Sequence, residues 1–314
     1  MTNFGLIGAA GYIAPRHMRA IRDVGGDLKV AYDPNDSVGI IDSHFPHAEF
    51  FTEFEAFDRH VSELRRQQIG LDYIAVCSPN YLHEAHTMHG LRSGAHVICE
   101  KPLVLNPGDL ENLARCEADT GRRVFSILQL RLHPTVNALR DRIAASRTRH
   151  NVDLTYITSR GRWYHASWKG DDRKSGGVAT NIGVHFFDML QYVFGPVVSS
   201  SGHLRDASRA AGAITFEKAD VRWFLSLDSN NLPDSVKGAK TTYRSVLIDG
   251  EELEFSDGFT DLHSVSYEAI LAGKGYGLDN VRPSIELVSR FRTAELTQDG
   301  SLHPSAERHL SGAV

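Results

Sequence analysis

One stretch of the sequence combines residue types and spacing that could carry out acid/base chemistry. Residues 176–188 read Gly-Gly-Val-Ala-Thr-Asn-Ile-Gly-Val-His-Phe-Phe-Asp, so Asn181, His185 and Asp188 recur at helical spacing and are expected to share one helix face. Two glycines before the helix would let the backbone approach a ligand, and an imidazole can exchange a proton with a substrate hydroxyl. The stretch indicates a site around His185, although a buried structural histidine would give the same pattern.

A second candidate group is Lys101, in the sequence Glu100-Lys101-Pro102 that follows the apolar run 96–99. The residue before a proline is pushed towards extended geometry, so the chain should leave its strand there. An ammonium at a strand end could stabilise a developing alkoxide, or act as a base if its pKa were lowered. An exposed lysine without a role is the alternative.

The start of the chain has the pattern of a nucleotide-binding turn. An apolar run at 4–8 leads into Gly-Ala-Ala-Gly-Tyr-Ile-Ala at 8–14, and a helical pattern follows. In a strand–turn–helix unit of this kind, glycines allow close approach of a pyrophosphate and the helix N-terminus stabilises its charge. Alanine replaces glycine at positions 10 and 14, so the motif departs from the full pattern.

An acidic residue follows at the distance that a dinucleotide site requires. Asp33 ends the expected strand 28–32 and could accept hydrogen bonds from the adenosine ribose. A carboxylate there would repel a 2′-phosphate, so the sequence favours NAD over NADP. A turn residue before Pro34 is the alternative.

Polar residues also follow the apolar run 71–77. The sequence Ser-Pro-Asn at 78–80, and then His83, should line the nicotinamide side, because ligands gather beyond the carboxyl ends of parallel strands. His83, His86 and His89 could suggest a metal face. No carboxylate or cysteine completes a ligand set, so no metal site is expected.

Strands and helices alternate through the first part of the chain. A helix is expected at 107–120 and a strand at 124–130, after the elements already described. This alternation predicts an α/β Rossmann domain with a doubly wound parallel sheet, in residues 1–125.

The pattern changes in the second part of the chain, where strands follow one another without intervening helices. They are expected at 153–159, 222–228, 243–249 and 252–255, with a hairpin turn at Asp249-Gly250. We therefore expect an α+β domain with an open, mostly antiparallel sheet in residues 126–314.

Residues 160–174 are dense in cations and aromatic rings, although the chain as a whole is acidic. The segment contains Arg160, Arg162, Trp163, Tyr164, Trp168, Lys169, Arg173 and Lys174. It could be a solvated loop, or a clamp for carboxylate or phosphate with rings that stack on a base or sugar.

Composition narrows the class of protein. The 314 residues carry a formal net charge of −5, which gives no basic footprint for nucleic acid. The three cysteines lack metal-ligand spacing and indicate reduced thiols. Neither an export signal nor a membrane span is evident, so a cytoplasmic protein is expected.

The glycine turn, Asp33, Glu100-Lys101-Pro102 and the 176–188 stretch together resemble the glucose-fructose oxidoreductase and inositol dehydrogenase family. The resemblance covers nearly the whole chain and implies tightly bound NAD, Lys101 and His185 as catalytic groups, and a homo-oligomer, with a tetramer expected. Residues 5–21, 155–161, 163–164 and 254–263 resemble those members that oxidise the C3 hydroxyl of UDP-N-acetylglucosaminuronate for bacterial O-antigen. In that case 2-oxoglutarate could reoxidise the cofactor.

The expected site residues fall into two groups. Those expected to bind the cofactor are Gly8, Gly11, Tyr12, Ile13, Asp33, Ser78, Pro79, Asn80, His83, Glu100 and Lys101. Those expected to bind the UDP-sugar are Lys101, Arg160, Tyr164, Lys169, Asn181 and His185. Two alternatives stay open: a dehydrogenase of a free sugar or inositol, and a nucleotide-binding regulator that has lost its chemistry.

Overall fold

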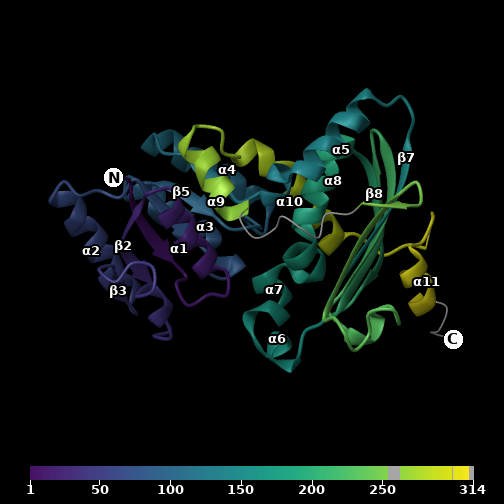
Figure 1. Ribbon diagram of the computed structural model, residues 1–314, viewed down its shortest axis with the longest axis horizontal. Coiled ribbons are helices and arrows are strands. Elements are labelled where there is room, and N and C mark those ends of the chain that lie inside the picture. Colours follow the sequence, from purple (N-terminus) through teal and green to yellow (C-terminus); the bar gives the residue numbers. More distant parts are fainter. Residues whose placement is uncertain (254–261, 299, 311–314) are drawn as a thin grey trace. The chain divides into compact units, whose positions relative to one another are not determined.

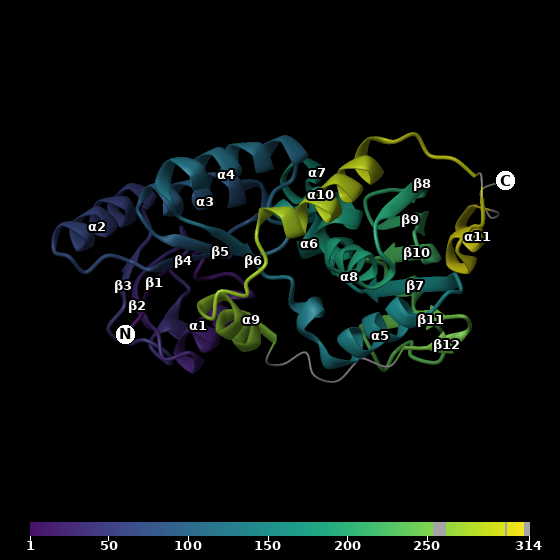
Figure 2. The ribbon, with the colours of Figure 1, turned by 90° about the horizontal axis from the view of Figure 1, so that it is seen from above.

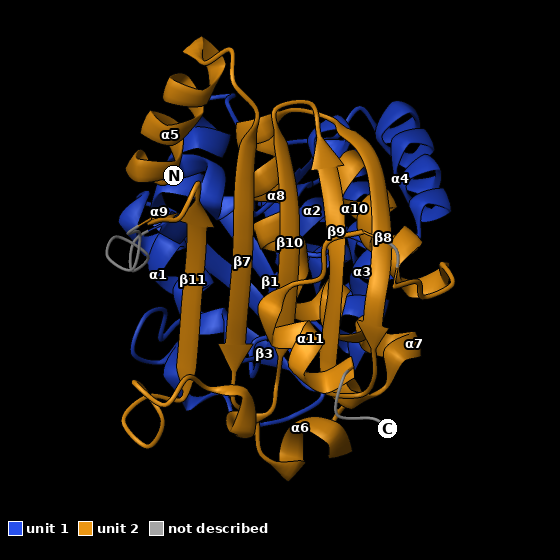
Figure 3. Cartoon of the chain, turned by 90° about the vertical axis from the view of Figure 1, so that its right-hand side faces the viewer, with its two compact units in different colours: residues 1–132, 259–282 blue, residues 133–258, 283–314 orange. Residues whose placement is uncertain are grey.

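The computed structural model describes residues 1–253, 262–298 and 300–310. The chain forms two compact units, which Figure 3 colours separately: residues 1–132 with 259–282, and residues 133–258 with 283–314. This differs from the continuous division after residue 125 that the sequence suggested. The segment 259–282, for which the sequence predicted no element, belongs to the first unit.

The first unit contains a six-stranded parallel sheet with the order β3-β2-β1-β4-β5-β6. Its strands are β1 (Asn3–Ile7), β2 (Asp27–Tyr32), β3 (Glu49–Phe51), β4 (Tyr73–Val76), β5 (His96–Cys99) and β6 (Val124–Ser126). The predicted doubly wound sheet is confirmed. Strand β3 was not predicted because three residues carry little periodic signal, and β6 ends at Ser126 rather than at 130.

Helices cover both faces of this sheet. Figure 2 shows α3 and α4 on one face and α1 and α9 on the other. The helices of the unit are α1 (Ala14–Asp23), α2 (Phe54–Arg66), α3 (His83–Arg92), α4 (Pro107–Thr120) and α9 (Leu262–Leu271). The bounds of α4 match the prediction because both caps are local: Asn106 forms a capping box with Asp109, and Gly121 ends the helix at φ 66°.

The second unit contains a mixed sheet with the order β12-β11-β7-β10-β9-β8, in which only β7 and β10 are parallel neighbours among the strands described. Its strands are β7 (His150–Thr158), β8 (Val197–Arg205), β9 (Arg209–Phe216), β10 (Ala219–Ser226), β11 (Thr242–Ile248) and β12 (Glu251–Glu252). The mostly antiparallel sheet is confirmed. Strands β8 and β9 were not predicted, since they are rich in serine, alanine and glycine.

The predicted turn at Asp249-Gly250 joins β11 to β12, and both residues have positive φ angles of 53° and 88°. Such angles suit the two-residue hairpin that the dipeptide predicted. The expected strand 252–255 is shorter, because β12 ends at Glu252 and positions 254 and 255 lie outside the described residues.

Neighbouring residues of β10 build the two hydrophobic faces of the second sheet. The Trp223 ring packs against Phe187 of α8 (Val184–Phe194) and Phe291 of α10 (Leu278–Thr293), with centroids 5.0 and 4.7 Å apart. The next residue, Phe224, stacks on His309 of α11 (Pro304–Leu310) at 5.7 Å. Figure 3 accordingly shows α8 behind the strands and α11 in front of them. The alternation of side chains along the strand produces this arrangement.

The fold also contains α5 (Pro134–Ala145), which lies in the second unit. No helix in the described ranges combines the length and the apolar character needed to cross a membrane.

Candidate active site

The glycine turn lies between β1 and α1. A Cβ at Gly8, where φ is 94°, would lie 2.5 Å from the backbone nitrogen of Ser78, so only glycine fits. Gly11 donates from its amide to the Gly8 carbonyl at 3.1 Å. The turn therefore passes against the end of β4 and brings the backbone to the start of α1, as a pyrophosphate site requires. Tyr12 is exposed and Ile13 is half-buried.

Asp33 lies at the end of β2 and is buried. Its Oδ2 accepts from the Ala10 amide at 2.9 Å, and its Oδ1 accepts from the Asn35 amide at 2.9 Å. The carboxylate thus ties the glycine turn to β2, a role that the sequence did not reveal. A hydrogen bond from Asp33 to ribose stays a prediction.

The loop after β4 is joined to the loop after β5 by His83. This side chain is buried, with Nδ1 2.7 Å from the Pro102 carbonyl oxygen and Nε2 2.8 Å from that of Ser78. Burial lowers the pKa of His83, although both carbonyls act in the opposite direction. Its imidazole therefore links two strand ends, and a direct contact with the cofactor stays a prediction, as it does for Ser78, Pro79 and Asn80.

The three histidines at i, i+3 and i+6 do not converge on one point. The Nδ1 of His86 contacts the Ser78 hydroxyl at 2.8 Å, whereas His89 lies against the Phe54 ring and 3.7 Å from Asp58. The rings of His86 and His89 both pack against Phe54, at 5.3 and 4.9 Å between centroids. A cluster of three potential metal ligands exists elsewhere, at His17, Glu100 and His263.

Glu100 and Lys101 follow β5 directly. Lys101 is half-buried, and its backbone amide donates to Glu100 Oε2 at 3.2 Å. The other carboxylate oxygen of Glu100 accepts from His17 and His263 at 3.2 and 2.9 Å. Sequence reasoning placed Glu100 at the cofactor and missed both histidines. One signal was present: His17 lies in the apolar stripe of α1 with Met18 and so needed a buried partner.

The structure confirms the helix that was predicted after the glycine pair in the second unit, and it adds a π-helical turn before that helix. Gly176 and Gly177 have φ angles of 82° and 75°, and a π-helical turn, Ala179–Gly183, precedes α8. Asn181 lies in this turn and His185 in α8, and both are half-buried, whereas Asp188 is buried. A π turn holds more residues than an α turn, so Asn181 is offset from the helical spacing that His185 and Asp188 keep within α8.

Tyr164 connects the basic aromatic segment to this helix. Its hydroxyl accepts from Asn181 Nδ2 at 2.5 Å, and the ring is buried. Burial raises the pKa of Tyr164, so the phenol stays protonated at neutral pH. The short helix α6 (Arg162–Ala166) that carries Tyr164 is therefore tied to the π turn, and the two stretches singled out in the sequence are in contact within the second unit.

Cations and rings of the basic aromatic segment lie close together. Lys169 Nζ lies 4.4 Å from the Trp168 ring centre and 5.8 Å from that of Trp163. Arg160 is exposed, and Arg173 is an exposed partner of Asp171 at 3.4 Å. An ammonium held over indole faces keeps its charge available to an anion while the rings offer stacking surfaces.

The thiols are unsuited to nucleophilic chemistry. Cys77, Cys99 and Cys116 are free and buried. Burial raises the pKa of each, so the reactive thiolate form is disfavoured.

The doubly wound sheet, the glycine turn at the point where its strand order reverses and the acid at the end of β2 define a dinucleotide-binding α/β protein. Residues 2–127 match the family described as "Oxidoreductase family, NAD-binding Rossmann fold". Residues 149–299 match "Oxidoreductase family, C-terminal alpha/beta domain". The chain belongs to this Gfo/Idh/MocA oxidoreductase family, and NAD is its cofactor.

Solved structures extend the comparison over both units. The WlbA (WbpB) dehydrogenase from Thermus thermophilus, in complex with NAD and alpha-ketoglutarate, is 49% identical with a TM-score of 0.94, over 97% of this chain and 99% of that one. Its complex with NAD and UDP-GlcNAcA gives 48% identity and a TM-score of 0.93 over the same shares. The WlbA dehydrogenase from Bordetella pertussis, at 20% identity and a TM-score of 0.75 over 93% of this chain and 96% of that one, shares the fold.

Curated relatives match shorter segments. D-glucoside 3-dehydrogenase of Escherichia coli is 30% identical over 41% of this chain, and the match spans 38% of that relative. A putative UDP-kanosamine synthase oxidoreductase subunit of Amycolatopsis mediterranei is 30% identical over 64% of this chain and 56% of its own length.

Proposed function

We propose that this protein oxidises the C3 hydroxyl of UDP-N-acetylglucosaminuronate to a ketone with NAD. The observation that carries the proposal is the 48% identity, over 97% of the chain, to a dehydrogenase in complex with NAD and UDP-GlcNAcA. That similarity covers the glycine turn of the first unit and the basic aromatic segment of the second. A free sugar or inositol as substrate would offer Arg160 and Lys169 no anionic group.

The residues of the first unit fit NAD. Gly8 lets the turn pass close to the backbone at the end of β4, where any Cβ would clash with Ser78. Asp33 holds the turn through Ala10, and its position after β2 suits the ribose. When bound, NAD⁺ supplies the acceptor for the hydride from C3. We propose contacts from Gly8, Gly11, Tyr12, Ile13, Asp33, Ser78, Pro79, Asn80, His83, Glu100 and Lys101.

The basic aromatic segment has the chemistry of a uronate or pyrophosphate site. We propose that Arg160 and Lys169 bind the anionic groups, since charge-assisted hydrogen bonds are the strong ones. Tyr164 holds the Asn181 amide through its hydroxyl. Asn181 is thereby positioned to orient a sugar hydroxyl.

Lys101 and His185 are the proposed groups for proton transfer. One takes the C3 hydroxyl proton as the hydride leaves, and the other stabilises the charge on the same oxygen. His185 is held between rings, 6.1 Å from the Tyr156 ring and 4.2 Å from that of Phe186, which limits its motion. Single-turnover NADH formation by Lys101→Ala and His185→Ala will tell which of the two groups takes the proton.

We also propose the setting of the reaction. Alcohol oxidation by NAD⁺ is uphill near neutral pH, so a 2-oxo acid such as 2-oxoglutarate would reoxidise tightly held NADH. The neighbour in complex with alpha-ketoglutarate supports this step. The free, buried thiols fit a cytoplasmic protein. We further propose a homo-oligomer, expected to be a tetramer, that serves O-antigen synthesis.

The test begins with protein purified without added nucleotide. Mass spectrometry identifies the nucleotide released on denaturation, which we expect to be NAD. NAD-loaded protein mixed with UDP-N-acetylglucosaminuronate should then give a burst of NADH absorbance that 2-oxoglutarate removes. UDP-N-acetylglucosamine, which lacks the carboxylate, and myo-inositol are the controls. An equal burst with myo-inositol would contradict the proposal.

A further inference from the structure

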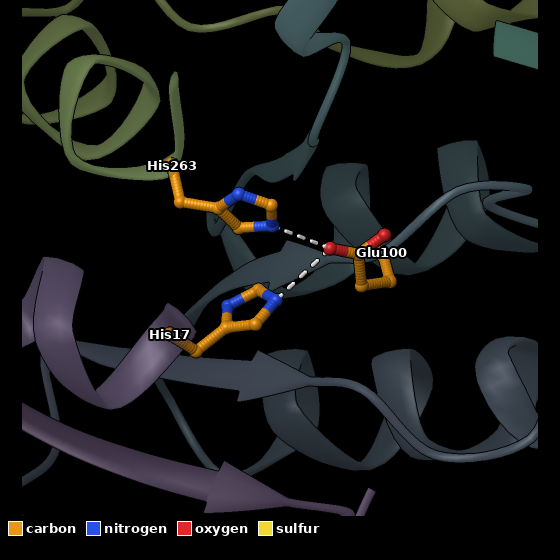
Figure 4. Close-up of side chains that lie close together, drawn as sticks. All are labelled: His17, Glu100 and His263. Carbon is orange, nitrogen blue, oxygen red and sulfur yellow. Dashed lines mark hydrogen bonds and ion pairs between the residues drawn. The ribbon is translucent and has the colours of Figure 1, made fainter. Parts of the chain in front are cut away.

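A buried polar cluster in the first unit lies directly beside Lys101, and its two histidines and its tyrosine have no role in the reaction as proposed. Figure 4 shows two imidazoles aimed at one oxygen of a carboxylate. We define the Glu100 cluster as Glu100, its two donors and the tyrosine behind one of them: His17, Glu100, His263 and Tyr267.

The cluster joins three separate segments of the fold. His17 comes from α1, the helix that the glycine turn opens, and Glu100 from the end of β5. His263 and Tyr267 come from α9, the helix that returns to this unit from late in the chain. Each of these four residues is at most 6% exposed. Burying polar and charged side chains destabilises a fold unless each polar atom has a hydrogen-bond partner.

The hydrogen bonds of the cluster form a consistent chain of donors. The Tyr267 hydroxyl donates to His17 Nδ1 at 2.8 Å, which leaves the proton of a neutral His17 on Nε2. That nitrogen and His263 Nε2 donate to Glu100 Oε1. Burial lowers the pKa of His17 and raises that of Tyr267, so this assignment holds at neutral pH.

Glu100 is thereby kept ionised. Burial alone would raise the pKa of this carboxyl, but the hydrogen bonds from His17 and His263 outweigh it and hold the pKa well below its usual range. The second oxygen, Oε2, accepts from the Lys101 backbone amide. A carboxylate fixed by two imidazoles on one side therefore fixes the backbone of Lys101 on the other.

We propose that the Glu100 cluster positions Lys101 for turnover. His17, His263 and Tyr267 act through Glu100, and the Glu100 carboxylate acts on Lys101 through its peptide. The inference rests on the proposed role of Lys101 in the reaction. A displacement of about 1 Å of a reacting group can cost on the order of a hundredfold in rate, so loss of one imidazole should be visible in kcat.

The main experiment compares two substitutions of His263 in NAD-loaded protein. His263→Gln keeps an N–H donor near the position of Nε2, whereas His263→Leu removes it. We expect His263→Leu to lower kcat at least tenfold with KM and retained NAD unchanged within about threefold, and His263→Gln to recover most of the loss. The control is the matched pair His96→Gln and His96→Leu, at the start of β5, the strand that Glu100 follows. These two variants should leave kcat unchanged.

A second measurement does not depend on the substrate. Hydrogen exchange followed by mass spectrometry should show faster exchange of the Lys101 amide in His263→Leu and in Glu100→Gln, with β4 and β6 unchanged, and normal exchange in His263→Gln. If the unmutated protein fails to turn over the UDP-sugar while this exchange pattern holds, the proposed function is wrong and the positioning of Lys101 stands.

Three outcomes would overturn the inference. The first is near-normal kcat in His263→Leu. The second is an equal loss in His263→Gln and His263→Leu with no change in Lys101 exchange. The third is a stoichiometric transition metal in the purified protein that is lost in His263→Leu, because the same three ligand atoms lie within 4.8 Å of one another and would then form a metal centre.

Discussion

The surroundings of Glu100 and the basic aromatic segment hold their charges in opposite ways. The Glu100 carboxylate is buried, and protein donors satisfy both of its oxygens. Arg160, in contrast, is exposed, and Lys169 lies over an indole ring. In a low-dielectric interior, removing one partner leaves a costly unpaired charge, whereas exposed cations are screened and gain energy only when a ligand arrives. The first region is thus suited to fixed geometry and the second to recognition.

The sharpest test of this contrast removes one proton-transfer group from each unit. Lys101→Ala and His185→Ala should each lower single-turnover NADH formation by about 10² to 10⁴, with NAD still bound. Under the proposal that both act on one oxygen and its proton, the double variant should be scarcely slower than either single variant. A near-normal burst from His185→Ala would make it a packing residue and leave Lys101 as the base.

A substitution in the glycine turn should also have a large effect, but on NAD affinity and not on the rate of hydride transfer. Gly8→Ala places a Cβ against the Ser78 backbone and forces a residue with a side chain into a positive φ angle. We expect NAD affinity to fall at least tenfold, measured by fluorescence titration of nucleotide-free protein. Gly39→Ala, where the added Cβ meets open space, is the control.

Substitutions in the basic aromatic segment should have a smaller effect, and that effect should depend on the salt concentration. Arg160→Ala and Lys169→Ala each remove one charge-assisted bond worth roughly 1.5 to 3 kcal/mol, or about tenfold to a hundredfold in UDP-sugar affinity, and leave NAD binding unchanged. The loss should shrink as ionic strength rises. Titration calorimetry at low and high salt measures both effects, with Arg173→Ala, already paired with Asp171, as the control.

Cofactor choice tests a residue that serves both structure and binding. Asp33→Ala should reduce the preference for NAD over NADP by about tenfold, through loss of a ribose acceptor and of repulsion. Because Asp33 also holds Ala10, the same variant should bind NAD less well. Equal use of both cofactors by the unmutated protein would remove Asp33 from the selective role.

The smallest expected effect is on the free energy of unfolding at acid pH, compared between the unmutated protein and Glu100→Gln. The folded pKa of Glu100 lies well below its unfolded value of about 4.5, so its stabilisation is fully present above pH 4.5 and is lost as the pH falls towards the folded value. The advantage of the unmutated protein over Glu100→Gln should shrink by up to about 1.4 kcal/mol per pH unit below 4.5. Urea unfolding between pH 6 and 3 measures it, and a constant difference would contradict the assignment.

Local patterns in the sequence determined much of this protein. The glycine turn, the capping box of α4 and the Asp249-Gly250 hairpin each depend on a few adjacent residues, so they were predicted with the right type and place. The same holds for Lys101 at a strand end and His185 on a helix. Residues 254–261, which contribute to the resemblance to the UDP-sugar-oxidising members of the family, lie outside the described part of the chain.

Only the tertiary structure decided the long-range features. The return of 259–282 to the first unit, and with it the contact of His263 with Glu100 across 163 positions, has no periodic signal in the sequence. The link between Tyr164 and Asn181 and the strands β8 and β9 also depend on residues far apart or of low strand propensity. Periodicity reports which face of an element is buried, whereas the partner of a buried polar atom is chosen by packing in three dimensions.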